Sequence, residues 1–214
     1  MKTVKYIFLV FLGITFFLDV KLQAKPILPK SYLPLPIVVQ ETNYSCGAAS
    51  LLSVLSYWGV FSGEESELYE PLGTTPEDGT EPTKIVAVAE SYGLKTSLKE
   101  HVNIDDLKKA VKKGISVILD LQAWRSEEEK KLSWANVWES GHYVVVVGID
   151  HRYAYFMDPS AGPAYAYTSL WELDERWHDY EDGSEGVSRS DHLAIFIQGT
   201  APFKKKPRSL ILME

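Results

Sequence analysis

The chain has 214 residues, 45% of them hydrophobic, and a formal net charge of −7. This length and composition suit one globular domain with a sizeable buried core. A negatively charged surface repels nucleic acid and anionic lipid, so nucleic-acid binding is excluded as a function and no nucleic-acid partner is expected.

The N-terminus has the pattern of a secretory signal peptide. Lys2 and Lys5 precede an apolar run over residues 6–18, and a Leu-Gln-Ala sequence ends at Ala24. The run is too short to span a bilayer comfortably, so we predict a signal peptide over 1–24 that is cleaved after Ala24; an uncleaved anchor is the alternative. Cleavage removes three lysines and one aspartate, which takes the net charge from −7 to −9. The mature protein is expected in the periplasm or outside the cell, with no stable membrane span.

The first helix is expected to begin at Cys46. Residues 25–36 hold four prolines, which favours an extended lead-in rather than a helix, and 37–39 is expected as a short strand. From Cys46 onwards the apolar residues recur at helical spacing, and Gly59 is a typical stop signal.

The rest of the chain divides into helices followed by an antiparallel sheet. We expect helices over 64–70, 82–92, 103–114 and 169–177, and strands over 116–121, 143–149, 153–157, 165–167 and 192–198. Residues 122–140 are polar and rich in tryptophan, and are expected either as a functional loop or as a short exposed helix. A turn-rich loop is expected over 182–190 and a solvated tail over 200–214. The predicted fold class is therefore α+β, with one domain over 37–199.

Cys46 is the only cysteine of the chain. An exported protein with one cysteine has no internal disulfide, so this thiol is inert packing, an intermolecular link or a reactive nucleophile. At the first turn of a helix the dipole favours a thiolate, and a nearby histidine that takes the proton lowers the pKa of the thiol further. The position therefore favours a nucleophile.

His142 and Asp158 are the candidate partners of this thiol. His142 directly precedes the strand expected over 143–149, and the next strand ends at Asp158. If the turn between these strands is centred near His151, residue 142 lies opposite residue 160, give or take two. Side chains paired in this way are about 5 Å apart on one face of the sheet. A carboxylate there would orient the imidazole and stabilise its charged form.

Gln40 is the candidate for stabilising an oxyanion. It lies six residues before Cys46, and its side-chain amide can aim an N–H at the oxyanion together with the backbone N–H of Cys46. His178 and His192 could bind metal in principle, but no spacing of two or three ligands supports a site. No metal and no cofactor are therefore expected.

Three further residues are expected to contact a substrate. Gly47 would let a substrate approach the backbone closely, and Gly141 precedes His142. Trp138 is expected, with other tryptophans, to line a peptide-binding groove beside His142, because tryptophan is enriched in recognition surfaces. Packing of loops onto the sheet explains the tryptophans at least as well.

Three segments together resemble the C39 family of papain-like cysteine peptidases. They are QETNYSCGAASLLSVLSYWG from Gln40, GHYVVVVGID from Gly141 and FMDPS from Phe156. The resemblance covers residues from about 36 to 198 and implies a helical half and an antiparallel-sheet half, with the active cleft between them. It also implies a Cys/His/Asp triad plus an oxyanion glutamine, at Cys46, His142, Asp158 and Gln40.

The chain departs from the best-known members of that family, which are domains fused to peptide exporters and cut leader peptides after a double glycine. It has no transporter segment, no ATP-binding motif and no Gly-Gly pair, and it carries an export signal. It therefore resembles the stand-alone, exported branch of the family. Double-glycine specificity is not carried over.

The leading hypothesis is an exported cysteine peptidase that hydrolyses peptide or protein substrates through a Cys-His-Asp triad and an acyl-enzyme. A transpeptidase or amidase on the same fold is the first alternative, in which an amine or thiol takes the acyl group. The second is a non-catalytic peptide-binding module, against which the intact candidate residues argue. A dimer linked by a Cys46 disulfide is a further alternative, which non-reducing electrophoresis would reveal.

Overall fold

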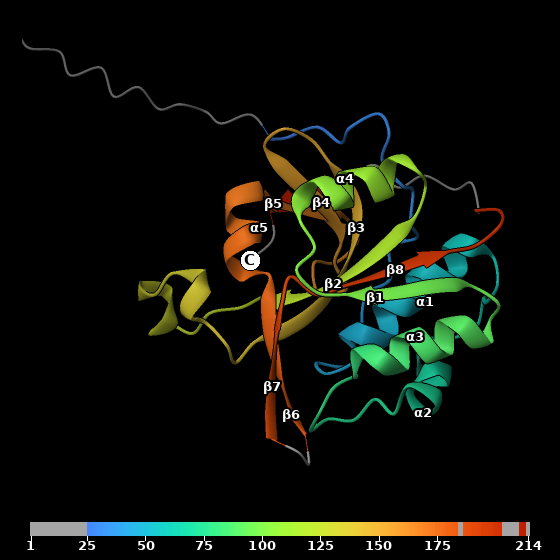
Figure 1. Cartoon of the computed structure of the whole chain (residues 1–214), viewed down its shortest axis with the longest axis horizontal. Coiled ribbons are helices and arrows are strands. Elements are labelled where there is room, and N and C mark those ends of the chain that lie inside the picture. Colours follow the sequence, from blue (N-terminus) through green and yellow to red (C-terminus); the bar gives the residue numbers. More distant parts are fainter. Residues whose placement is uncertain (1–24, 184–185, 203–209, 213–214) are drawn as a thin grey trace, which may run out of the picture.

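The computed structural model describes residues 25–183, 186–202 and 210–212 (Figure 1). The predicted signal peptide over 1–24 and the basic run over 204–208 lie outside the described residues. The helices are α1 (Cys46–Trp58), α2 (Tyr69–Leu72), α3 (Pro82–Ser91), α4 (Ile104–Lys112) and α5 (Leu170–Arg176), with short 3-10 helices η1 (Glu65–Leu68), η2 (Glu129–Lys131) and η3 (Trp134–Asn136). None of the helices in the described part of the chain is both long and apolar enough to cross a membrane.

A seven-stranded sheet forms the other half of the molecule, in the order β1-β8-β2-β3-β4-β5-β9. Neighbouring strands are antiparallel except β5 and β9. The strands are β1 (Lys95–Lys99), β2 (Ser116–Gln122), β3 (Gly141–Ile149), β4 (Tyr153–Met157), β5 (Tyr165–Ser169), β8 (Ala194–Gln198) and β9 (Leu210–Leu212), and a separate hairpin joins β6 (His178–Gly183) and β7 (Gly186–Asp191). The predicted α+β class, with a helical half packed on a largely antiparallel sheet, is confirmed.

α1 is the central helix and is buried on nearly all sides. It begins at Cys46 and is followed by Gly59, whose φ of 68° is a left-handed conformation that glycine adopts without strain. The hydroxyl of Ser50 donates to the backbone carbonyl of Tyr143 at 3.1 Å. This buried bond ties the first half of α1 to β3, so the N-terminal residue of the helix has a defined position relative to that strand.

β2 and β3 lie at the centre of the sheet. Every residue of β2 and most of β3 are buried, with α1 and α4 both packed against β3. Continuous apolar runs are typical of strands that are covered on both faces. Val145 pairs with Met157 across the β3–β4 hairpin. The sequence predicts a strand over 143–149 with His142 just before it. In the structure β3 begins at Gly141, so His142 lies inside the strand.

The lead-in before α1 forms no strand, so the strand expected over 37–39 is wrong. Single hydrogen bonds hold the lead-in instead. The N–H of Leu33 donates to the carbonyl of Val147 (2.7 Å), and the carbonyl of Pro36 accepts from the hydroxyl of Ser53 (2.6 Å). The prolines of this segment lack the N–H donors that a regular ladder needs.

Four strands are additional to the expected elements. β1 follows α3, the β6–β7 hairpin replaces the loop expected over 182–190, and β9 pairs with β5 where a solvated tail over 200–214 was expected. β1 and the hairpin consist mostly of polar residues, so they give little of the apolar alternation that marks a strand. The loop prediction and this part of the tail prediction are therefore wrong.

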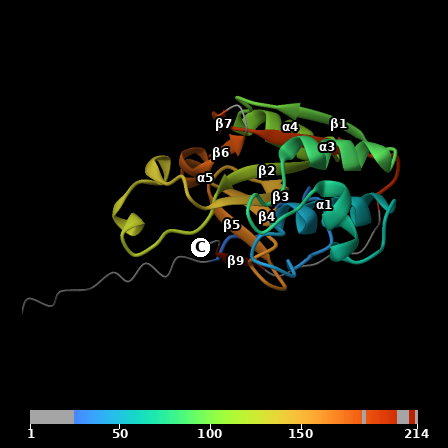
Figure 2. The same ribbon diagram turned by 90° about the horizontal axis from the view of Figure 1, so that it is seen from below.

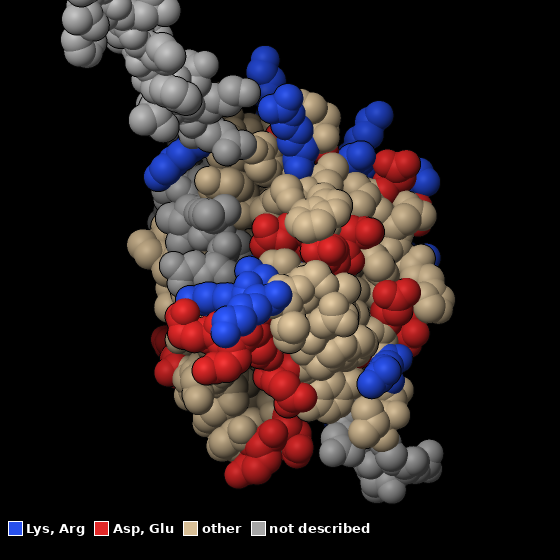
Figure 3. All heavy atoms as spheres, turned by 90° about the vertical axis from the view of Figure 1, so that its left-hand side faces the viewer, with Lys and Arg blue, Asp and Glu red and all other residues tan. Residues whose placement is uncertain are grey.

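The segment between β2 and β3 is a long loop that contains η2 and η3. It projects from the body at the end opposite α1, α2 and α3 (Figures 1 and 2). The ring of Trp134 anchors it, with the guanidinium of Arg125 at 4.1 Å and that of Arg176, in α5, at 3.6 Å from the ring centroid. Figure 3 shows the face with this loop, where acidic side chains gather in the lower part, in keeping with the negative net charge.

Candidate active site

Cys46 is the first residue of α1 and is partly buried. Burial raises the pKa of its thiol, but interactions with the His142 imidazole and with the backbone of Tyr143 and Gly47 outweigh burial. The net result is a pKa below the ordinary value of a cysteine. A thiol in this setting is a stronger candidate for a nucleophile than for inert packing.

The imidazole of His142 is held by a carboxylate. His142, on β3, and Asp158, directly after β4, are both buried, and Nε2 of the imidazole lies 2.8 Å from Oδ1 of Asp158. The same Oδ1 accepts from the backbone N–H and the hydroxyl of Ser160, at 2.9 and 2.8 Å. Because a carboxylate only accepts, the hydrogen-bond network assigns a proton to Nε2. Nδ1 is then the ring nitrogen that remains for Cys46.

Asp158 and Cys46 together raise the pKa of His142. Burial alone would lower this pKa, but the hydrogen bond to Asp158 and the interaction with Cys46 raise it to about 9. Burial likewise raises the pKa of Asp158, while its contact with His142 brings the pKa below the ordinary value. Both shifts favour the ion pair of thiolate and imidazolium over the neutral pair.

The thiol of Cys46 and the imidazole of His142 interact without a hydrogen bond of regular geometry. Within the described residues, Nδ1 of His142 is buried and has no partner at hydrogen-bond geometry, although it interacts with Cys46. Catalytic hydrogen bonds are often long before a substrate binds and tighten only afterwards. This geometry is therefore compatible with a thiol–imidazole pair that closes when a substrate binds.

Gln40 lies in the turn before α1. Its backbone N–H donates to the carbonyl of Pro159 at 3.0 Å, which places it beside the loop that carries Asp158. Its side-chain Nε2 donates to the carbonyl of Thr42 at 2.6 Å, and in the described part of the chain its buried Oε1 has no hydrogen-bond partner. The second N–H of the amide is the donor that it can offer to an oxyanion.

Gly47 has a packing reason to be glycine. A Cβ at this position would lie 2.7 Å from the Cβ and 2.8 Å from the hydroxyl oxygen of Thr80. The absence of a side chain lets the loop over 73–80 pack against the first turn of α1. Contact of Gly47 with a substrate stays a prediction.

Gly141 and Trp138, also expected to contact substrate, are close to the β6–β7 hairpin. A Cβ on Gly141 would collide with the carboxylate of Asp179. The ring of Trp138 packs on that of His178, with centroids 4.3 Å apart, and the guanidinium of Arg189 lies 4.8 Å from its centroid. Both residues hold the hairpin near β3, and their contact with substrate stays a prediction.

Trp124 is the tryptophan that contacts His142. Their ring centroids are 4.7 Å apart, and Trp124 is 40% exposed. The aromatic ring covers part of the imidazole, which limits its access to water. Nothing in the sequence separates Trp124 from Trp138, because the irregular loop between β2 and β3 has no periodicity that would show which ring packs on His142.

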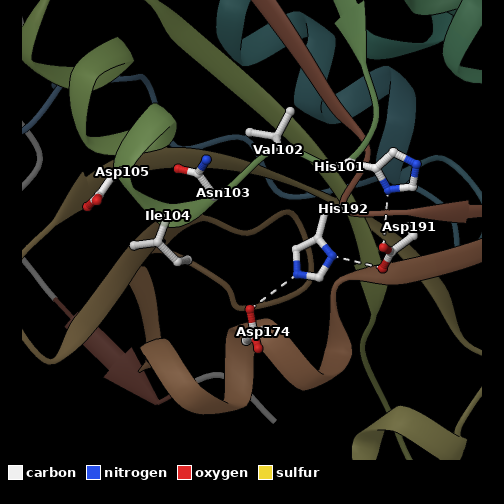
Figure 4. A pocket seen from close by; sticks show the side chains of 8 residues that line it. All are labelled: His101, Val102, Asn103, Ile104, Asp105, Asp174, Asp191 and His192. Carbon is white, nitrogen blue, oxygen red and sulfur yellow. Dashed lines mark hydrogen bonds and ion pairs between the residues drawn. The ribbon is translucent and has the colours of Figure 1, made fainter.

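A pocket of about 450 Å³ lies apart from these residues, between the β1–α4 loop, α5 and the segment before β8 (Figure 4). Asp191 contacts the rings of His101 and His192, at 3.3 and 2.8 Å, and the second nitrogen of His192 lies 3.3 Å from Asp174. Among the described residues no three potential metal ligands are arranged to hold an ion. The histidines of the pocket are therefore paired with Asp191 and Asp174, while Asp105 pairs with Lys108 of α4.

Sequence comparison places these features in a known family. Residues 32–184 match the model of the Peptidase_C39-like family. An uncharacterized protein of Methanothermobacter thermautotrophicus is 31% identical over 127 residues, which cover 59% of this chain and 72% of that protein. The family match over residues 32–184 includes Gln40, Cys46, His142 and Asp158.

Two solved peptidase domains share the fold. A double-glycine-motif protease from an AMS/PCAT transporter, solved in complex with the leader peptide, has a TM-score of 0.54 at 22% identity, covering 80% of this chain and 96% of that one. The peptidase domain of Streptococcus ComA, a bi-functional ABC transporter of a quorum-sensing pathway, has a TM-score of 0.56 at 20% identity, covering 78% and 99%. At these identities the likeness shows the fold alone. With the family match over most of its length, the chain belongs to the Peptidase_C39-like family of the papain-like fold.

Proposed function

We propose that this chain is an exported cysteine peptidase that hydrolyses peptide bonds through an acyl-enzyme. Its family and fold are those of C39 peptidases. One observation carries the finer assignment: Asp158 holds one ring nitrogen of His142 at 2.8 Å, and the other nitrogen is left for Cys46 at the N-terminus of α1. Export rests on the signal-peptide pattern over 1–24.

The first half of the reaction forms a thioester. The Cys46 thiolate attacks the peptide carbonyl carbon, a C–S bond forms, and the carbonyl electron pair moves onto oxygen. The backbone N–H of Cys46 and the second amide N–H of Gln40 stabilise this oxyanion. As the C–N bond breaks, His142 gives its Nδ1 proton to the leaving amine while Asp158 keeps the ring oriented.

The second half releases the acyl group. Neutral His142 takes a proton from a water molecule as the water oxygen attacks the thioester carbon. When the C–S bond breaks, the product leaves as a carboxylic acid, and the thiolate beside the imidazolium is restored. The cycle uses only groups of the chain and water.

A peptide is the substrate class that the comparisons support. One protease of the same fold has been solved in complex with its leader peptide. The site is built from groups suited to a carbonyl flanked by a poor leaving group, which is what a peptide bond is. Trp124, partly exposed beside His142, offers an apolar face near the reacting bond.

Digestion of a defined mixture of synthetic peptides by the mature chain, followed by mass spectrometry, tests this function. We expect new peptide ends with the wild type and a rate at least about 10³-fold lower with Cys46→Ala or His142→Ala. Equal cleavage by all three proteins, or none by any, would contradict the proposal. Products that carry an added amine in place of water would indicate acyl transfer instead of hydrolysis.

Export is tested separately by the mass of the secreted chain. Cleavage by the host's signal peptidase predicts a mature N-terminus at Lys25. Recovery of the full-length chain only from the cytoplasmic fraction would contradict export, and it would leave the peptidase proposal intact.

A further inference from the structure

A buried carboxylate lies against the turn that joins Gln40 to Cys46. Glu65, the first residue of η1, is only 2% exposed. Burial raises the pKa of its side chain, which means that the surroundings oppose its charge. The acidic segment predicted as a helix thus places one of its carboxylates inside the molecule, and nothing in the sequence distinguishes this glutamate from its neighbours.

Glu65 binds both ends of the turn. Its Oε2 accepts from the backbone N–H of Glu41 at 3.1 Å, and Glu41 directly follows Gln40. The hydroxyl of Ser45, which directly precedes Cys46, lies near enough to the carboxylate to lower its pKa. One side chain therefore links the residue after the candidate oxyanion donor to the residue before the candidate nucleophile.

Further hydrogen bonds hold the middle of the 40–46 turn beside the Glu65 side chain. The hydroxyl of Ser45 accepts from the backbone N–H of Thr42 (3.1 Å) and donates to the Thr42 carbonyl (3.3 Å). That carbonyl also accepts from Nε2 of Gln40 at 2.6 Å. Hydrogen bonds thus join the Gln40 amide to Thr42 and Thr42 to Ser45, whose hydroxyl lies beside the Glu65 carboxylate. The hydroxyl of Tyr69 donates to the other oxygen of the carboxylate at 3.1 Å and fixes its orientation.

We propose that Glu65 is a positioning residue for the oxyanion site, because it holds the 40–46 turn so that the Gln40 amide and the Cys46 backbone N–H face the same point. This proposal rests on the proposed peptidase function. Glu65 acts through the turn and does not contact the reacting atoms, so it is distinct from the Cys46, His142 and Asp158 group. Stabilising a developing oxyanion requires donors that are fixed before the reaction.

If Glu65 positions the oxyanion donors, its loss should slow one reaction of the Cys46 thiol and leave another unchanged. Iodoacetamide reacts with Cys46 by displacement of iodide, which creates no oxyanion. p-Nitrophenyl acetate reacts by attack on an ester carbonyl: a C–S bond forms, an oxyanion develops, and p-nitrophenolate leaves. The second reagent therefore depends on the oxyanion donors and the first does not, while both depend on the thiolate.

The test compares both rates in Glu65→Leu, Glu65→Gln and the wild-type mature chain. For Glu65→Leu we expect acylation about tenfold slower, with the iodoacetamide rate unchanged to within about twofold. Glu65→Gln should recover most of the acylation rate, because the amide oxygen can still accept from Glu41 while the Tyr69 hydroxyl turns to accept from the NH₂ group. Glu67→Leu is the matched control. Glu67 is exposed and accepts from the backbone N–H of Glu64 at the start of η1, away from the 40–46 turn, so both rates should be unchanged.

The outcomes distinguish this proposal from the peptidase proposal. Equal loss of both rates in Glu65→Leu, or no loss of either, overturns the positioning role. If Glu65→Leu does not unfold cooperatively on heating, Tyr69→Phe is tested in its place, because it removes one hydrogen bond from the same carboxylate. A wild-type ratio of the acylation and alkylation rates in Tyr69→Phe then overturns the proposal. A wild-type Cys46 that reacts with both reagents like a free thiol contradicts the peptidase function itself, whatever Glu65 does.

Discussion

At the scale of single residues, two ionisations bound the pH range in which Cys46 and His142 act together. Rising pH first deprotonates the thiol, whose pKa is lowered by His142 despite burial, and creates the nucleophile. Rising pH then removes the imidazolium proton with a pKa of about 9, and this is the proton that the leaving amine needs. Peptide hydrolysis should therefore show a bell-shaped pH profile with its basic limb near pH 9. A profile that keeps rising beyond pH 10 would contradict the assigned role of His142.

Replacing Asp158 with asparagine should move that basic limb. The amide oxygen can still accept from Nε2 of His142, but the negative charge that stabilises the imidazolium is gone, so the pKa of His142 falls. We expect the limb to shift to lower pH and hydrolysis at pH 8 to fall by about 10- to 100-fold. Ser160→Ala is the control, since it removes only a hydroxyl donor from the same Oδ1. A limb that stays in place in Asp158→Asn would show that the carboxylate does not set the pKa.

At the scale of elements, the sequence predicts those helices and strands of the site whose apolar residues recur with a regular period. α1 begins at Cys46, as expected from its helical spacing, and β4 ends at Met157, directly before Asp158. The expected pairing of residue 142 with residue 160, give or take two, is in register with the Val145–Met157 pair, although a bulge between Val146 and Gly148 shifts the register by one residue nearer the turn. The approach of Asp158 to His142 could therefore be predicted within that tolerance. α1 carries Cys46, β3 carries His142, and Asp158 directly follows β4.

The remaining parts of the site depend on contacts between segments far apart in the chain. Glu65 is one of several acidic residues in its segment, and only the packing of η1 against the turn before α1 buries it. Trp124 reaches His142 through an irregular loop that has no period to follow. Gly47 is explained by Thr80, which belongs to a turn-rich loop 33 residues further on. Local secondary-structure propensity and hydrophobic patterning contain no information on contacts between segments that are far apart in the chain.

Gly47→Ala should perturb the packing of α1 against the loop over 73–80. The added Cβ would lie 2.7 Å from that of Thr80, so the loop or the helix must shift. We expect a loss of about 1–3 kcal/mol in the free energy of unfolding and slower alkylation of Cys46, since overpacking of this kind forces backbone movement. Denaturant unfolding and the alkylation rate measure the two effects.

A second substitution checks the cause of that effect. Thr80→Gly removes the Cβ, the methyl group and the hydroxyl that the new side chain would meet. The cost of Gly47→Ala should therefore be smaller in the Thr80→Gly background than in the wild type. An equal cost in both backgrounds would mean that the strain arises elsewhere in α1.

At the scale of the whole molecule, the site exists only when the two halves are packed together. Cys46 comes from the helical half, while His142 and Asp158 come from the central and neighbouring strands of the sheet. A single core spans both halves, with α1 packed directly on β3. Small domains with one core usually unfold cooperatively. The reactivity of Cys46 is then a property of the global fold rather than of α1 alone.

The enhanced alkylation of Cys46 at pH 7 should therefore disappear in the same guanidinium transition as the far-ultraviolet circular dichroism signal. In the unfolded chain the thiol has its ordinary pKa and loses the imidazole. Coincident midpoints for the two measurements are the expected result. Loss of enhanced reactivity at a clearly lower denaturant concentration would show that the halves separate before the fold is lost.

The alkylation rate of Cys46 by iodoacetamide, measured from pH 4 to 9 in the wild type and in His142→Ala, tests the central claim most directly. It needs no substrate, and with a single cysteine in the chain the label reports on one site. The thiolate–imidazolium pair predicts rapid labelling below about pH 7 in the wild type and loss of that labelling in His142→Ala. Labelling that follows an ordinary thiol in both proteins would contradict the pair, and with it the proposed peptidase mechanism.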